Sequence, residues 1–226
     1  KAAGEFLLSL GAKSVLTLDD SSAYGKTLIT NLKSGLGSQA SVVADLSVSQ
    51  VADLELTIKA INNLKPDVVF YGGGPTLGGA LLKQLRTSGN QAPFVGGNRL
   101  SSAAFLKDIT KATTGIYYTE TLAPLAAYPK AKGFVKDFRN RWKREPSSLA
   151  VEAFDATNAL LELISKQPNP TRLGVLAGLR KQKLAVGLSG PMVFATNGDR
   201  KNAIVYVINL GSDLKPRITA QFSSKR

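Results

Sequence analysis

In the segment Asp67-Val68-Val69-Phe70-Tyr71 every residue after the aspartate is apolar or aromatic, and the turn-forming run Gly72-Gly73-Gly74-Pro75 follows directly. A strand that is apolar on both faces is typical of a parallel sheet covered by helices on each side, because neither face then meets water. Glycine and proline end such a strand and leave a loop at its carboxyl end. This run therefore predicts an α/β fold.

Strands and helices alternate along the rest of residues 1–120. Short β-prone runs predict strands at Ser14–Leu18, Ser41–Asp45, Phe94–Gly96 and Gly115–Glu120. Apolar residues at helical spacing predict helices between them, at about 26–36, 51–65, 76–86 and 101–106. This regular alternation is the pattern of a doubly wound α/β lobe.

After Thr121 the sequence becomes mostly helical, with helices expected at about 130–142, 148–166 and 171–181. The middle helix has one continuous apolar face, made of Leu149, Ala153, Ala156 and Leu160 and joined by Phe154 and Leu161. Further on, residues 192–194, a turn at 196–199 and a strand at 203–210 predict a hairpin.

Cysteine and histidine are absent from the sequence. Their absence excludes disulfides, thiolate chemistry, Cys/His zinc sites and every mechanism that needs an imidazole base. No nucleophile paired with a base is recognisable, so we expect no enzyme and predict no catalytic residue, cofactor or metal.

Two glycine-containing segments partly match phosphate-binding loops. Gly25-Lys26-Thr27 has the end of a P-loop, but Asp20 stands at the first glycine position, where a carboxylate would repel phosphate. The run from Gly72 to Gly79 fits G-x-G-x-x-G in no register. A nucleotide site is therefore not expected in either segment.

The formal net charge is +13, but the Lys and Arg residues are spread along the chain. Local clusters fall on predicted helices, where a solvated face is the usual explanation. We therefore expect only weak, salt-sensitive binding to nucleic acid and no specific nucleic-acid partner.

Loops at the carboxyl ends of three predicted strands, residues 19–24, 72–76 and 97–100, should converge on one edge of the sheet, where open α/β sheets bind ligands. Their candidate binding residues are Tyr24, Gly73, Gly74 and Asn98. Three alternatives stay open: Tyr24 could pack in the core, Asn98 could cap a turn, and the glycines could serve a close backbone approach.

The chain resembles the leucine/isoleucine/valine-binding protein family, whose members have the type I periplasmic-binding-protein fold and serve ABC transporters. The resemblance spans the chain and rests on an ordered set of short motifs: Asp20-x-x-x-Tyr24-Gly25, Pro66 to Gly73, Pro93-Phe94-Val95-Gly96, Ala153-Phe154-Asp155-Ala156, Leu179-Arg180 and Gly190-Pro191-x-x-Phe194-x-x-x-Gly198-Asp199.

The resemblance implies two α/β lobes that enclose a ligand as they close. It assigns residues 1–122, with 203–226 returning, to one complete doubly wound lobe, the second. It assigns residues 123–202 to the C-terminal half of the first lobe, whose N-terminal part has no counterpart here. We expect that missing segment to be a partner of this chain.

Residue by residue, the resemblance implies that Tyr24 and Phe154 are aromatic ligand contacts. Asn98 stands where amino-acid binders have an acidic residue for the ligand's ammonium group, and Gly74 stands where they often have a tyrosine. Both differences count against an amino acid as the ligand.

We therefore expect a periplasmic or extracellular solute-binding protein, with membrane tethering through a segment outside this chain left open. It would enclose a small polar ligand, an amino acid or a related compound, and deliver it to an ABC permease. The alternative is a ligand-sensing domain of a membrane receptor with the same fold.

Overall fold

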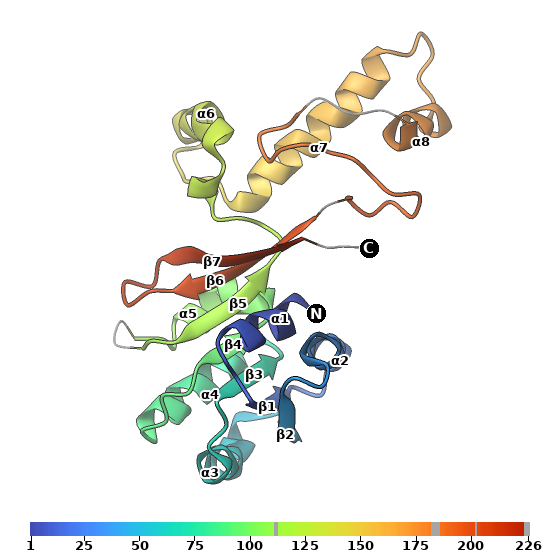
Figure 1. The fold of residues 1–226 in the computed structure, drawn as a ribbon. Coiled ribbons are helices and arrows are strands. Elements are labelled where there is room, and N and C mark those ends of the chain that lie inside the picture. Colours follow the sequence, from blue (N-terminus) through green and yellow to red (C-terminus); the bar gives the residue numbers. More distant parts are fainter. Residues whose placement is uncertain (111–112, 182–185, 202, 224–226) are drawn as a thin grey trace. The chain divides into compact units, whose positions relative to one another are not determined.

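The computed structural model describes residues 1–110, 113–181, 186–201 and 203–223. The chain divides into two compact units (Figure 1): Lys1–Thr121 with Val205–Phe222, and Leu122–Ile204 with Ser223–Arg226. The predicted assignment of these parts to two lobes stays a prediction. Among the described residues, no helix is both long and apolar enough to cross a bilayer.

The first unit is built around a sheet in the order β2-β1-β3-β4-β5-β6-β7. Its strands are β1 (Ser14–Asp19), β2 (Ser41–Ser47), β3 (Val68–Gly72), β4 (Phe94–Gly96), β5 (Ile116–Glu120), β6 (Ile204–Leu210) and β7 (Pro216–Ser223). The pairings from β2 through β5 are parallel, and β6 is antiparallel to β5. The predicted parallel α/β sheet is confirmed.

Helices cover both faces of this sheet (Figure 1). They are α1 (Ala2–Ser9), α2 (Ala23–Leu36), α3 (Leu54–Leu64), α4 (Pro75–Thr87) and α5 (Ala103–Leu106), with 3-10 turns at Val51–Asp53 and Asn98–Ser101. Successive side chains of β3 alternate between the faces: Val68 and Phe70 pack with α1 and α2, and Val69 and Tyr71 pack with α3 and α4. This two-sided burial explains the apolar run.

Helix α2 begins three residues earlier than its apolar spacing indicates. The hydroxyl oxygen of Ser22 accepts a hydrogen bond from the N–H of Gly25 at 3.0 Å, which caps the helix. Tyr24 consequently lies in the first turn of α2 rather than in the loop before it.

The second unit contains α6 (Lys132–Trp142), α7 (Ser148–Ser165) and α8 (Arg172–Lys181), preceded by 3-10 turns at Leu125–Ala127 and Pro129–Ala131. Its small core joins Ala159, Leu163 and Met192. The face of α7 that is buried carries Val151, Asp155, Ala159 and Leu163. The predicted apolar face is instead exposed, with Leu149 at 61% and Leu161 at 56%.

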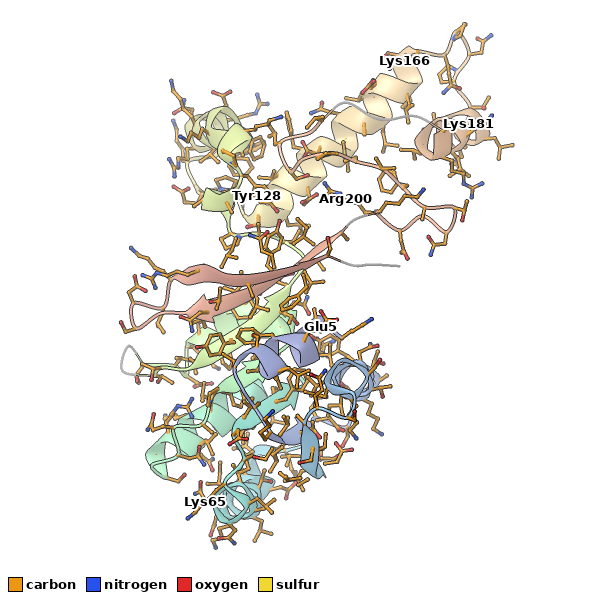
Figure 2. All side chains as sticks on the ribbon, in the orientation of Figure 1. Glu5, Lys65, Tyr128, Lys166, Lys181 and Arg200 are labelled. Atoms are coloured by element: carbon orange, nitrogen blue, oxygen red, sulfur yellow. The ribbon has the colours of Figure 1, made fainter. Side chains whose placement is uncertain are left out.

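Two acidic side chains of α7 have structural partners. The carboxylate of Asp155 accepts hydrogen bonds from the N–H groups of Leu188 at 2.8 Å and Ser189 at 2.7 Å. Glu152 pairs with Arg200, which is labelled in Figure 2, at 3.2 Å. Each carboxylate therefore holds a loop of the second unit in place.

The predicted hairpin is right in its turn and wrong in its second strand. Across the turn, Phe194 forms an antiparallel bridge with Arg200, and the N–H groups of Ala195 and Lys201 donate to the carbonyls of Asp199 and Val193, each at 2.7 Å. The strand of that prediction, β6, pairs with β5 instead. The structure also contains β7, which sequence reasoning missed although Ile218, Ala220 and Phe222 alternate with more exposed residues.

Candidate functional site

The carboxyl ends of β1 and β3 meet where the strand order reverses, because β2 lies on one side of β1 and β3 on the other. Such a switch point is where open α/β sheets place their binding crevice. Here the N–H of Asp20 donates to the carbonyl of Gly72 at 3.2 Å. A Cβ on Gly25 would lie 2.2 Å from that same oxygen, so the first turn of α2 packs directly against the end of β3.

The Asp20 carboxylate links the first two loops. One oxygen accepts from the N–H of Gly74 at 2.7 Å, and the other accepts from the N–H of Ser22 at 3.1 Å and from the Ser22 hydroxyl. Burial alone would raise the pKa of Asp20, but these hydrogen bonds outweigh it and hold the pKa below its ordinary value. Sequence reasoning named Asp20 as an obstacle to phosphate binding and as part of a family motif, but gave it no role in joining the loops; the Asp-x-Ser spacing of an Asx turn was the signal available.

Tyr24 links the first loop to the third. Its hydroxyl donates to the side-chain oxygen of Asn98 at 2.8 Å, and the guanidinium carbon of Arg99 lies 4.0 Å from the centre of its ring. A Cβ on Gly97 would come within 2.3 Å of the Tyr24 hydroxyl, so any larger residue there would displace the end of the Tyr24 side chain. Partial burial raises the pKa of Tyr24, which keeps its phenol protonated at neutral pH.

The structure brings Tyr24, Gly74 and Asn98 together at one edge of the first unit. Both backbone groups of Gly74 are already bonded there, because its N–H donates to Asp20 and its carbonyl accepts from the Tyr71 hydroxyl at 2.9 Å. The role of Tyr24, Gly74 and Asn98 in ligand binding stays a prediction. Gly74 cannot donate its N–H to a ligand without breaking its existing hydrogen bond to Asp20.

The other two predicted site residues stand apart in different ways. A Cβ on Gly73 would lie 2.4 Å from the Tyr71 hydroxyl, so Gly73 serves a close approach within the loop. Phe154 belongs to α7 in the second unit, where its ring packs at 5.0 Å from that of Phe134. Phe154 therefore shares no unit with Tyr24.

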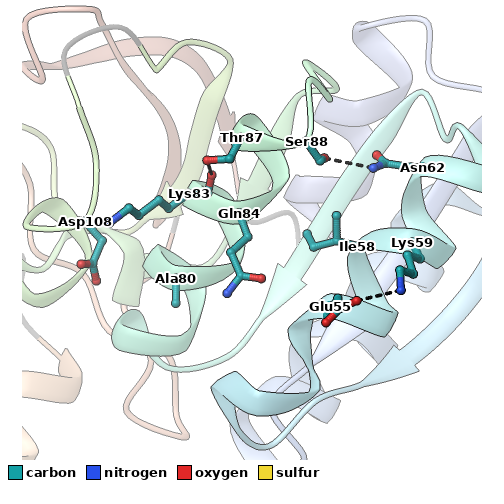
Figure 3. A pocket seen from close by; sticks show the side chains of 10 residues that line it. All are labelled: Glu55, Ile58, Lys59, Asn62, Ala80, Lys83, Gln84, Thr87, Ser88 and Asp108. Atoms are coloured by element: carbon teal, nitrogen blue, oxygen red, sulfur yellow. Dashed lines mark hydrogen bonds and ion pairs between the residues drawn. The ribbon is translucent and has the colours of Figure 1, made fainter.

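A separate hollow is lined by residues of both α3 and α4 (Figure 3), with a volume of about 610 Å³. Ile58 and Ala80 form part of its wall, and its charged groups include the Glu55–Lys59 ion pair at 2.7 Å. None of the five predicted site residues lines it. We therefore treat the sheet edge, and not this hollow, as the candidate site.

Comparison with known protein families shows which family the chain belongs to. A family model described as periplasmic binding protein matches residues 1–214. The chain belongs to the periplasmic binding protein family. Within this family it is 33% identical over 120 residues to the Leu/Ile/Val-binding protein BraC3 of Rhizobium johnstonii, a match that covers 52% of this chain and 33% of that protein.

Solved periplasmic binding proteins share the fold. A leucine-binding protein from Thermotoga maritima superposes with a TM-score of 0.80 at 23% identity, over 99% of this chain and 64% of its own length. A solute-binding protein from R. palustris, solved in complex with benzoate, gives a TM-score of 0.76 at 20% identity, over 97% of this chain and 61% of its own. The chain thus spans less than two thirds of these relatives, and the type I periplasmic-binding-protein fold is confirmed.

Proposed function

We propose that this chain is the ligand-binding part of an extracytoplasmic solute-binding protein that delivers a small molecule to an ABC permease. The observation that carries the proposal is the sheet edge at the switch point, where three loops are joined by side-chain hydrogen bonds around Tyr24. Membership of the periplasmic binding protein family supports it.

The edge is suited to binding without chemical transformation. Asn98 and Arg99 hold the Tyr24 ring in one orientation, so its contact with a ligand would cost little side-chain entropy. An aromatic ring adds a large contact area, and water is expelled when a second wall covers it. These features favour enclosing a ligand and not a chemical reaction with it.

We infer that the second wall needs polypeptide that the relatives have beyond the matched region. Several large apolar side chains of α7 are exposed: Leu149, Phe154, Leu160, Leu161 and Ile164. An apolar helix face of this kind is normally covered by a sheet. The family's missing half-lobe is the occupant we propose for it.

The test uses the full-length protein and isothermal titration calorimetry. Once a ligand has been found by a thermal-shift screen of amino acids and organic acids, Tyr24→Ala should weaken its binding by about 1 to 3 kcal/mol, as the loss of a buried aromatic contact does. Tyr24→Phe should lose less, because it keeps the ring and removes only the hydroxyl that bonds Asn98.

Leu56→Ala is the matched control, because Leu56 is a large side chain on α3 that is 74% exposed and lies outside the three loops. It should leave affinity unchanged. Equal affinities of wild type and Tyr24→Ala, with both proteins folded, would remove Tyr24 from the site. A full-length protein that binds no solute in the screen would refute the proposed function.

A further inference from the structure

Arg99 is placed at the candidate site without a carboxylate partner. Arg139, Arg200 and Arg217 each form an ion pair with Asp or Glu. Within the part of the chain that the structure describes, Arg99 has no such pair, and its guanidinium lies over the Tyr24 ring instead. A cation–π contact orients a guanidinium while leaving its N–H donors free for another acceptor.

The acidic side chains of this edge already accept hydrogen bonds. Asp19 accepts from the N–H of Ser21 at 2.6 Å and from the Ser47 hydroxyl at 3.1 Å. Asp20 is bonded to Ser22 and Gly74, and Glu120 accepts from the N–H of Thr121 at 2.9 Å. Asn98, next to Arg99, offers only a neutral amide.

The binding groups at this edge therefore differ from those expected for an amino acid, which carries both an ammonium group and a carboxylate. A buried ammonium group needs an ionised partner, whereas the carboxylates of this edge already accept hydrogen bonds from the protein and the residue bonded to Tyr24 is an amide. A carboxylate, in contrast, is the planar acceptor that a guanidinium binds with two parallel hydrogen bonds.

We propose that Arg99 pairs with a carboxylate of the ligand and that the ligand is an organic acid without an α-ammonium group. This inference rests on the proposed solute-binding function and narrows it to one ligand class. Arg99 is then a specificity-determining residue that the Tyr24 ring holds in place, and Tyr24 is in turn held by Asn98.

The experiment measures calorimetric affinities of the full-length protein for benzoate, its neutral analogue benzamide, and leucine. The wild-type protein should prefer benzoate over benzamide and over leucine. Arg99→Gln should weaken benzoate binding by about 10- to 100-fold, the range for loss of a hydrogen bond between charged groups, and should leave benzamide nearly unaffected. Arg99→Lys keeps the charge but not the planar fork, so its benzoate affinity should lie between those of the wild type and Arg99→Gln.

Arg141→Gln supplies the matched control, because the Arg141 guanidinium also lies over an aromatic ring, that of Trp142 at 5.4 Å, but belongs to α6 of the second unit. It should not change benzoate affinity. Tighter binding of leucine than of benzoate, or benzoate affinity insensitive to Arg99→Gln, would overturn this inference and leave the solute-binding proposal standing. Failure of all amino acids, organic acids and neutral solutes to bind would overturn both.

Discussion

Gly25 shows how little space the sheet edge leaves at a single residue. An added Cβ would meet the Gly72 carbonyl oxygen at 2.2 Å and an Asp20 carboxylate oxygen at 2.9 Å, and the first of these is backbone that cannot rotate away. We expect Gly25→Ala to lower the free energy of unfolding of the first unit by about 3 kcal/mol, the upper end for overpacking. Urea unfolding followed by circular dichroism measures this change.

Gly133→Ala is the comparison, since Gly133 lies in α6 and an added Cβ there would meet no neighbouring atom of the described residues within 4 Å. It should be neutral or should stabilise the second unit by up to about 1 kcal/mol, because alanine restricts the unfolded chain and favours helix. Equal effects of the two substitutions would mean that the close approach of α2 to β3 is not a constraint.

Single residues also mark what sequence could and could not predict. Tyr24 and Asn98 were accessible because both follow strands whose carboxyl ends must meet at one edge. The stacking of Arg99 on Tyr24 and the bonding of Asp20 to Gly74 were not, because each depends on side-chain rotamers across residues far apart in sequence. The prediction that Phe154 contacts the ligand rested only on the family resemblance.

At the level of elements, Asp20 ties the start of α2 to the start of α4 through bonds that favour its ionised form. A folded-state pKa below the unfolded one means that the stabilisation is complete at neutral pH and is lost as pH falls through the lowered pKa. Asp20→Asn should therefore be less stable than wild type at pH 7, and the difference should shrink steadily on acidification below about pH 4. Urea midpoints at several pH values measure this difference, and parallel pH profiles for the two proteins would exclude Asp20 as its source.

Most elements followed from the sequence because apolar periodicity reports burial directly. Besides the exposed face of α7 and the missed strand β7, two errors have a clear physical cause. The start of α2 depends on a cap that apolar spacing does not report, and the pairing of β6 depends on a partner far upstream, which a local turn signal cannot reveal. The turn at residues 196–199 correctly predicted that the chain doubles back there, but the returning segment that pairs across it is at Arg200 and not in β6.

For the whole molecule, we expect residues 1–226 alone to self-associate and to bind ligand weakly. The exposed face of α7 lacks a cover among the described residues, and a site with one wall buries too little of its ligand. Replacing both Leu149 and Leu161 by Ser should shift the sedimentation profile toward monomer. Leu56→Ser, at a similarly exposed site on α3, should not.

Addition of the proposed upstream segment as a separate chain should restore monodispersity, raise the melting temperature and increase ligand affinity together. A 226-residue chain that is monomeric, melts cooperatively and binds solute at micromolar affinity would contradict this expectation and the proposed cover for α7.

The antiparallel pairing of β5 with β6 has a consequence for synthesis on the ribosome. Glu120 pairs with Tyr206, so almost the entire second unit is translated between the two strands. Until β6 emerges, β5 is an edge strand with unpaired N–H and C=O groups, the state in which sheets join other chains. Completing the first unit must therefore wait for late translation, and chaperones that shield nascent strands should matter more for this protein than for one whose neighbouring strands are contiguous in sequence.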